Sequence, residues 1–257
     1  MASLIGSDPP CMANVFIEDK TGPTCTALPE VILQCDEDTD PGLLRFDTIE
    51  FASAGIGLGI GGLNPRYREA SQPIGSGRIV DVSLYIEAQF QDLSGLAMTL
   101  IAPDGSFYRM IDQPVSCSGI NDLNVTFNNS GNIFDCNNLF GTIQPEIGDL
   151  SDLQDMDKAG IWELAATDYN GSPYGIMDSA VLIISYDLMP QASDNCQVNI
   201  QYSDDESNLN QCRIGTVTRT FTVTDPGGRT SSCTQILNLE NDDIPAFTIE
   251  WPRDTVY

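Results

Sequence analysis

The sequence has 257 residues, with 37 Asp and Glu, 11 Lys and Arg and no His, so its formal net charge at pH 7 is −26. This charge argues against nucleic acid or an anionic membrane as a partner, because binding either requires a basic protein surface. The lack of His removes Ser-His-Asp and Cys-His catalysis and the commonest metal ligand. We therefore expect a protein that is not an enzyme.

The length allows two compact domains. The longest run of low polarity, Phe51 to Leu63, has 13 residues and is rich in Gly, which is too short for a transmembrane helix. Met1 is not followed by a basic region and an apolar core, as it would be in a secretion signal. We expect no membrane span, and we expect any secretion signal to lie outside this chain.

Eight Cys residues are scattered between strand-like segments, and none forms the C-x-x-C pair typical of zinc sites. An even number of Cys in a sequence rich in Asn, Thr, Ser and Gly favours an oxidised, extracellular framework. Sequence does not fix which Cys pairs with which. The candidate disulfides are Cys117 with Cys136, Cys196 with Cys212, and Cys11 with Cys25.

The N-terminal part of the chain contains a repeat of a later segment. Residues 11–23 (CMANVFIEDKTGP) align without gaps with residues 233–245 (CTQILNLENDDIP) at an offset of 222. Each copy reads as an alternating strand that ends in an acidic turn and then Pro, the pattern of a last strand leading into a linker.

The central part is predicted to form strands, because apolar side chains alternate or run together there. In the stretch from Gly160 to Tyr186, Trp162 and Leu164 share one face of a first strand, and the second strand is nearly all apolar. A polar loop joins the two strands. We predict that they pair as a hairpin that anchors the core of a sandwich.

These central segments resemble the P domain, or Homo B domain, which follows the catalytic domain in kexin-like proprotein convertases. Residues 79–86 are similar to that family's i-x-d-v-x-v-x-i strand, 96–106 (LAMTLIAPDGS) to its DL-x-i-x-L-x-x-P-x-G-T strand and turn, and 122–130 (DLNVTFNNS) to its tFdDs segment. Residues 87–89 (EAQ) replace the usual His-Thr step. The resemblance implies a β-sandwich of jelly-roll type, with a supporting role and no chemistry of its own.

A second pattern covers residues 194–240. It contains an Asp-Asn-Cys step at 194–196, an alternating strand at 217–225 (VTRTFTVTD) and a Cys-Thr-Gln step at 233–235. This order resembles the immunoglobulin-like HYR-type repeats of large bacterial surface adhesins. Residues 226–229 (PGGR) replace the Cys-Gly-Asn that is usual in those repeats.

The two resemblances divide an all-β chain into five parts. These are 1–25, the terminal strand of one Ig-like module and a candidate donor strand; 26–43, the opening of a second module; 44–188, an inserted P-like sandwich; 189–244, the rest of the second module; and 245–257, a terminal strand that starts a next module. An unpaired strand at either end could complete the sheet of another copy by β-strand addition. A fragment of a longer adhesin, or termini that pair within their own subunit, is the alternative.

Calcium is the one cofactor that the acidic turns suggest, because hard cations bind several oxygens that converge from a loop. Ordinary solvated turns, in which Asp and Asn cap the backbone, are the alternative. The candidate ligands are Asp168, Asn170 and Asp178 beside the central loop, and Glu240, Asp242 and Asp243 at a module junction.

Three triplets resemble the Asp-Ser/Thr-apolar motif of a bacterial extracellular O-glycosylation system. Their hydroxyl residues are Thr48, Ser179 and Thr255.

These observations lead to one preferred function and two alternatives. We expect an extracellular or cell-surface structural or adhesive protein, a unit of a bacterial surface adhesin or of a self-assembling filament. Its expected partners are further copies of itself through strand edges, and a surface glycan or a ligand on a host or neighbouring cell. An accessory segment of a secreted subtilisin-like protease and a carbohydrate-binding β-sandwich are the alternatives.

Overall fold

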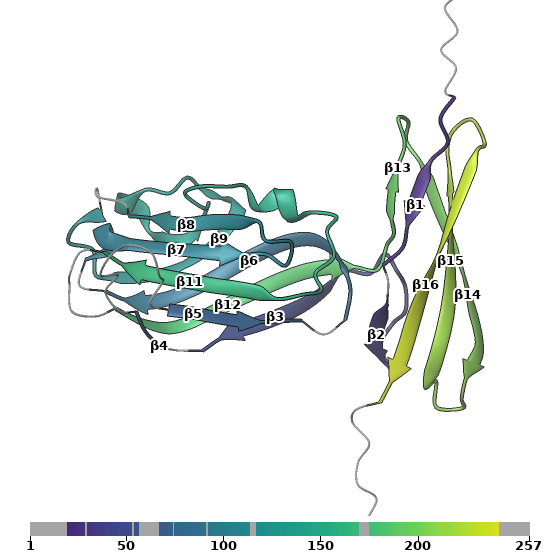
Figure 1. Ribbon diagram of the computed structural model, residues 1–257, viewed down its shortest axis with the longest axis horizontal. Helices are drawn as coiled ribbons and strands as arrows, with labels where there is room; N and C mark the ends of the chain where they lie inside the picture. The colour runs from purple at the N-terminus through teal and green to yellow at the C-terminus, as the bar shows by residue number, and fades with distance from the viewer. Residues whose placement is uncertain are drawn as a thin grey trace, which may run out of the picture.

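The computed structural model describes residues 20–28, 30–52, 54–56, 67–73, 75–90, 92–113, 117–169 and 175–241. Over these residues the prediction of an all-β protein is confirmed, because the chain forms sixteen strands joined by turns and short 3-10 helices. Figure 1 shows an elongated sandwich beside a smaller module. No helix among the described residues is long and apolar enough to cross a membrane.

One layer of the sandwich is a sheet of six strands in the order β10-β9-β6-β12-β3, with β4 also paired to β12. Strand β12 has the most partners and pairs in antiparallel fashion with β6, β3 and β4. The strands are β3 (Arg45–Phe51), β4 (Ala54–Ile56), β6 (Arg78–Gln89), β9 (Asp122–Asn132), β10 (Phe140–Ile143) and β12 (Gly175–Asp187).

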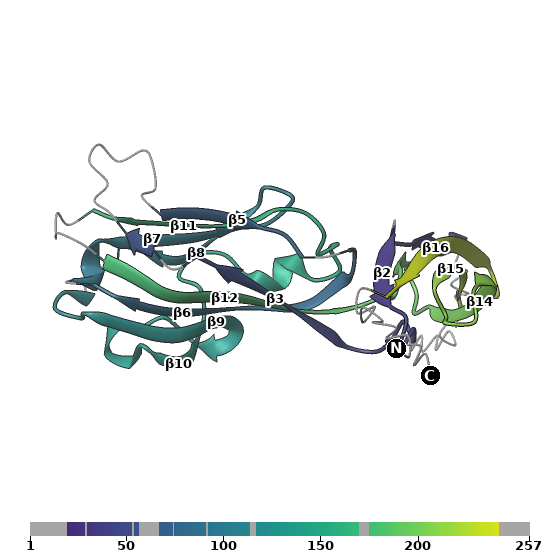
Figure 2. The same cartoon turned by 90° about the horizontal axis from the view of Figure 1, so that it is seen from below.

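The other layer is an antiparallel sheet of four strands in the order β5-β11-β7-β8. Its strands are β5 (Tyr67–Ser71), β7 (Leu96–Ile101), β8 (Phe107–Asp112) and β11 (Trp162–Asp168). Figure 2 shows the two sheets stacked face to face. The main hydrophobic core lies between them.

The core follows from the alternation of side chains along each strand. On β11, Trp162, Leu164 and Ala166 are buried, as predicted, while Ile161 just before the strand is 56% exposed. The indole Nε1 of Trp162 donates a hydrogen bond to the backbone carbonyl of Lys158 at 3.0 Å, so its one polar atom is satisfied inside the core.

The predicted hairpin between β11 and β12 is wrong. Strand β11 lies between β5 and β7, whereas β12 lies between β6 and β3 in the opposite sheet. Each strand already has a hydrogen-bonded neighbour on both edges, so β11 and β12 belong to opposite layers and do not pair with each other. Apolar periodicity identified both strands, but it does not specify which strand pairs with which.

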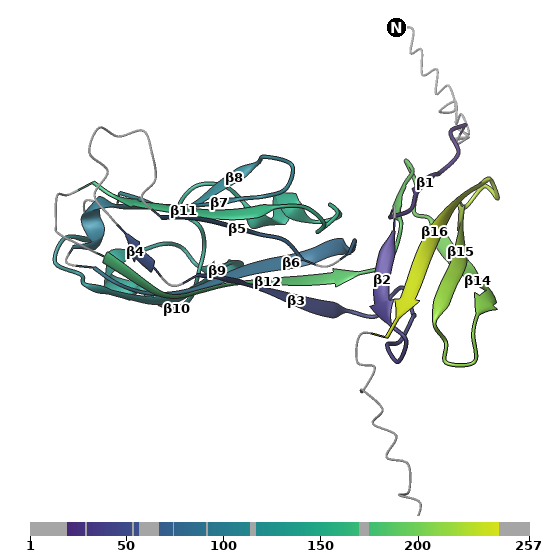
Figure 3. The ribbon, with the colours of Figure 1, turned by 60° about the horizontal axis from the view of Figure 1, so that its bottom comes forward.

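The smaller module combines segments from both sides of the sandwich. A four-stranded sheet has the order β14-β15-β16-β2, and a two-stranded sheet pairs β1 with β13. The strands are β1 (Thr24–Thr26), β2 (Val31–Gln34), β13 (Gln191–Ser193), β14 (Asn199–Leu209), β15 (Gly215–Thr224) and β16 (Thr230–Glu240). Figure 3 shows β2 beside β16, with which it pairs in parallel.

The end of β12 connects the sandwich to the module. Tyr186 and Leu188 leave the sandwich and enter the module's own hydrophobic core. The ammonium of Lys158, which is fully buried, lies 4.5 Å from the centre of the Tyr186 ring and 2.6 Å from Oδ2 of Asp47. A Cβ at Gly77 would lie 2.2 Å from that ring, so only Gly fits beside it.

Tyr186 makes the stability of this junction depend on pH. Burial raises its pKa to about 12, and the carboxylate of Asp47 adds to the effect. In the unfolded chain a Tyr titrates near about 10, so the unfolded state loses the proton first and stability falls as the pH rises from about 10 to about 12. We expect the loss to be larger by up to about 2 kcal/mol in the unchanged protein than in Tyr186→Phe, measured by urea unfolding. Equal losses in both proteins would contradict the burial of the phenol.

Candidate functional site at the edge of β13

The four-stranded sheet of the module has one apolar face. Along β15, Val217, Phe221 and Val223 are fully buried, and Leu237 and Leu239 of β16 are buried opposite them. The other face of β15 is a row of Thr, which are half-buried. The sheet therefore needs a second layer over its apolar face.

Strand β14 extends this apolar face but is poorly covered. Tyr202 is the cross-strand partner of Phe221, and their ring centres are 6.3 Å apart, so the two rings lie on the same face. Even so, Tyr202 is 48% exposed. Ile200, which pairs with the buried Val223, is half-buried. The second layer thus stops short of β14.

A buried guanidinium fixes the position of Tyr202. Arg219 is fully buried, and its Nε and Nη2 donate to the two carboxylate oxygens of Asp204 at 2.8 and 2.7 Å. The guanidinium carbon lies 4.8 Å from the centre of the Tyr202 ring, which is within cation–π distance. The exposed ring is therefore held in place rather than free to fold over the gap.

The second layer consists of β1 and β13, which are three residues long and paired with each other. Among the described strands none pairs with the other edge of β13, which carries the uncharged residues Gln191, Ala192 and Ser193. Directly after it, Oδ2 of Asp194 is inaccessible to solvent and has no hydrogen-bond partner among the described residues. A strand edge with unpaired backbone groups is a template for pairing with another chain.

The outer edge of β14 is protected in a way that the edge of β13 is not. Asp204, Asp205 and Glu206 lie in succession along β14, and the register shifts between Asp205 and Asn208. Charged residues and bulges are the devices by which edge strands avoid pairing with other chains. Of these two edges, the one on β13 is the one open to an added strand.

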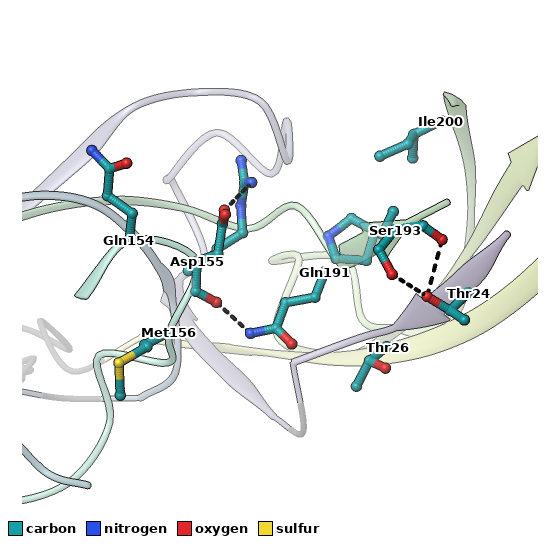
Figure 4. A pocket seen from close by; sticks show the side chains of 11 residues that line it. Thr24, Thr26, Gln154, Asp155, Met156, Gln191, Ser193 and Ile200 are labelled. Atoms are coloured by element: carbon teal, nitrogen blue, oxygen red, sulfur yellow. Dashed lines mark hydrogen bonds and ion pairs between the residues drawn. The ribbon is translucent and has the colours of Figure 1, made fainter. Parts of the chain in front are cut away.

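A cleft of about 520 Å³ lies beside β13, between the module and the sandwich (Figure 4). Oγ of Thr24 on β1 is 2.8 Å from Oγ of Ser193, and on the sandwich side Arg78 donates to Oδ1 of Asp155 at 2.8 Å. Across the cleft, Nε2 of Gln191 donates to the backbone carbonyl of Asp155. The cleft is lined by Thr24, Thr26, Arg78, Gln154, Asp155, Met156, Pro190, Gln191, Ala192, Ser193 and Ile200.

Two disulfides lie among the described residues. Cys117 is joined to Cys136, the pair predicted from the sequence. The predicted pair of Cys11 with Cys25 is wrong, because Cys25 on β1 is joined to Cys233 on β16. Pairing of β1 with β13 brings Cys25 over the four-stranded sheet, and the bond links the module's two layers. Cys11 lies outside the described residues.

The predicted pair of Cys196 with Cys212 is also wrong. Cys196 precedes β14 and Cys212 lies in the turn that follows it, and both are exposed. A strand of eleven residues separates its ends by about 35 Å, whereas the Cα atoms of a disulfide lie within about 7 Å of each other.

The candidate calcium ligands do not form a described cluster. Asp178 and Glu240 are exposed at distant places in the fold, on β12 and at the end of β16. Asn170, Asp242 and Asp243 lie outside the described residues, and so does the side chain of Asp168. No group of three or more acidic or Cys residues that could hold a metal occurs in the described part of the chain. Calcium binding stays a prediction.

The candidate glycosylation residues lie on strands where the structure describes them. Thr48 is exposed on β3 and Ser179 is half-buried on β12, while Thr255 lies outside the described residues. Most of the candidate donor strand, residues 1–19, also lies outside them. Sequence reasoning did not identify Ile200 and Tyr202, although their spacing of two on an otherwise polar strand was a signal of an apolar contact.

No protein-family model and no curated protein matches the sequence. A serine protease of Aeromonas sobria in complex with its chaperone is 14% identical, with a TM-score of 0.31 over 55% of this chain and 27% of that chain. The VP2 subviral particle of infectious bursal disease virus is 13% identical, with a TM-score of 0.28 over 74% and 41% of the two chains. This chain covers less than half of each of these proteins. At such TM-scores the likeness carries no argument, so both family resemblances stay predictions.

The disulfide between β1 and β16 is expected to hold the short second layer in place. Replacing both Cys25 and Cys233 with Ser should lower the stability of the module by about 2–4 kcal/mol. Hydrogen exchange should then accelerate in β1 and β13 but not in β6 and β12. The matched control replaces Cys117 and Cys136 and should leave β1 and β13 protected. Unchanged protection of β1 in the first variant would show that the disulfide does not hold this layer.

Proposed function

We propose that this chain is a non-enzymatic subunit of an extracellular adhesin or filament, and that copies join by adding a strand at the edge of β13. The proposal rests on Ile200 and Tyr202 of β14, which belong to the apolar face of the sheet but are only partly covered. An added strand would bury the Tyr202 ring and Ile200 and would pair with the backbone of β13. The two disulfides favour an oxidising, extracellular compartment.

The net charge of the chain favours contact between copies only at a small uncharged surface. A net charge of −26 keeps copies apart by repulsion. The residues of the β13 edge itself are uncharged, so an approaching strand meets no charge directly on that edge. Association would then depend on the backbone pairing and on the apolar contact, both of which occur in one place.

The donor in this proposal is the N-terminal segment, residues 1–19, of a neighbouring copy. Its sequence places Val15 and Ile17 two residues apart, the spacing of side chains on one face of a strand. Val15 and Ile17 thus have the same spacing as Ile200 and Tyr202, the two partly covered side chains on β14. The segment also ends before β1, so its removal leaves the described module intact.

Deleting residues 1–19 tests the donor. The shortened protein should remain folded by circular dichroism and should stay monomeric in analytical ultracentrifugation, at concentrations where the full chain assembles. Deleting residues 246–257 is the control and should leave assembly intact. Full assembly without residues 1–19, or its loss only in the control, would refute the assignment of the donor.

A pair of substitutions on β14 tests the acceptor. Ile200→Asp places a charge on the uncovered apolar stretch and should weaken association of copies by at least about tenfold, because an added strand would bury that charge unpaired. Gln201→Asp adds the same charge on the opposite face of the same strand and should have little effect. Equal effects of the two substitutions, by sedimentation, would contradict the position of the acceptor.

A further inference from the structure

A second recessed site lies on the sandwich, on the outer face of β5-β11-β7-β8. Four residues form a single row across the four strands, because Arg68 pairs with Ala165, Ala165 with Thr99, and Thr99 with Arg109. Small residues occupy the middle of the row and an Arg stands at each end. With strands about 4.8 Å apart, the row spans about 14 Å, which is longer than a single sugar ring.

Small side chains make the floor of this depression. Ala165 is 8% exposed and Thr167 is 4% exposed, although both point away from the core of the sandwich. The larger side chains around them therefore rise above the floor. The depression has a volume of about 410 Å³ and is lined by Arg68, Ala97, Thr99, Ile101, Gly105, Phe107, Arg109, Ala165, Thr167 and Tyr169.

Two aromatic side chains border the depression and are exposed. Phe107 is 63% exposed and Tyr169 is 38% exposed. The turn before Phe107 is fixed by Asp104, whose Oδ1 accepts hydrogen bonds from the backbone N–H and the hydroxyl of Ser106 at 2.9 and 2.6 Å. These bonds also hold the pKa of Asp104 below its usual range. Exposed aromatic rings on a rigid frame mark a contact surface.

The charges of the depression are balanced. Arg68 forms an ion pair with Glu163, and Arg109 forms one with Asp112. All four side chains keep part of their surface in solvent, with exposed fractions of 56% and 25% for the first pair and 40% and 29% for the second. Arg68 and Arg109 thus bring N–H donors to the lining of the depression, and the carboxylate partner of each lies next to that lining.

The exposed aromatic rings and the two ion pairs together favour one class of ligand over the others. A polyanion would meet two carboxylates locally and a net charge of −26 on the whole chain. An apolar ligand would cover two ion pairs without replacing their water. A peptide strand would need backbone partners, but the backbone groups of the floor strands β11 and β7 are already used in the sheet. A chain of hydroxyl groups satisfies donors and acceptors together, and its C–H faces can pack on aromatic rings.

We propose that this face binds a neutral oligosaccharide, with Phe107 and Tyr169 packed against sugar rings and the two ion pairs bound to sugar hydroxyls. Arg68 and Arg109 donate hydrogen bonds to hydroxyl oxygens, and Glu163 and Asp112 accept hydrogen bonds from hydroxyl protons. The site lies on the sandwich, away from the β13 cleft, and does not rest on strand addition. It would let an assembled protein hold a glycan-coated surface.

The test is isothermal titration of the full chain with cellohexaose, laminarihexaose, mannohexaose and chitohexaose as neutral probes, and with oligogalacturonate as an anionic probe. At least one neutral probe should bind. Phe107→Ala should weaken that binding by at least about tenfold, and Arg109→Met should weaken it in the same direction. Phe140→Ala is the matched control, because Phe140 is 67% exposed on β10 of the other sheet, and it should leave binding unchanged.

Three results would overturn the proposal. They are no binding of any neutral probe at about 10 mM, binding of oligogalacturonate alone, and equal loss of binding in Phe107→Ala and Phe140→Ala. Circular dichroism of each variant checks that it is folded, which is expected because both Phe side chains are largely exposed. Ile200→Asp should bind the same probe as the unchanged chain, so a failure of strand addition and a failure of glycan binding are distinguishable.

Discussion

A β-sheet with one apolar face must cover that face, and the smaller module meets this requirement only in part. Four strands of up to eleven residues stand opposite two strands of three residues. The short layer covers Phe221 and Val223 but leaves the Tyr202 ring, on the same face, half exposed. This imbalance leaves Ile200 of β14 at the cleft and leaves the edge of β13 open.

The sandwich forms one wall of the cleft, and its connection to the module fixes where that wall lies. Strand β12 runs from the six-stranded sheet into the core of the module, where Tyr186 and Leu188 are buried. The turn at Gln154–Met156 forms the opposite wall. Arg78 on that wall is tied to Asp187 at 2.8 Å, and this bond raises the pKa of the guanidinium. The cleft beside β13 therefore depends on the sandwich, on the smaller module and on the junction between them.

Sequence was informative where local periodicity decides the outcome. The alternation of Trp162 and Leu164 predicted a strand with one buried face, and Cys117 and Cys136 were paired correctly because they bracket one polar segment inside the predicted sandwich. Long-range pairing was not predictable in the same way. Cys25 and Cys233 are 208 residues apart, and only the pairing of β1 with β13 brings them together. The cleft was not predicted because β13 has only three residues, and these show no apolar alternation.

In the assembly proposed above, a strand of another chain completes the module at β13. Hydrogen exchange of the backbone amides of residues 191–193, compared between dilute monomer and assembled protein, tests it most directly. Exchange at these amides should become slower on assembly, and so should exchange around Ile200, whereas exchange at the charged outer edge of β14 should not change. Assembly with unchanged exchange at residues 191–193, or a protein that stays monomeric at every concentration, would contradict it.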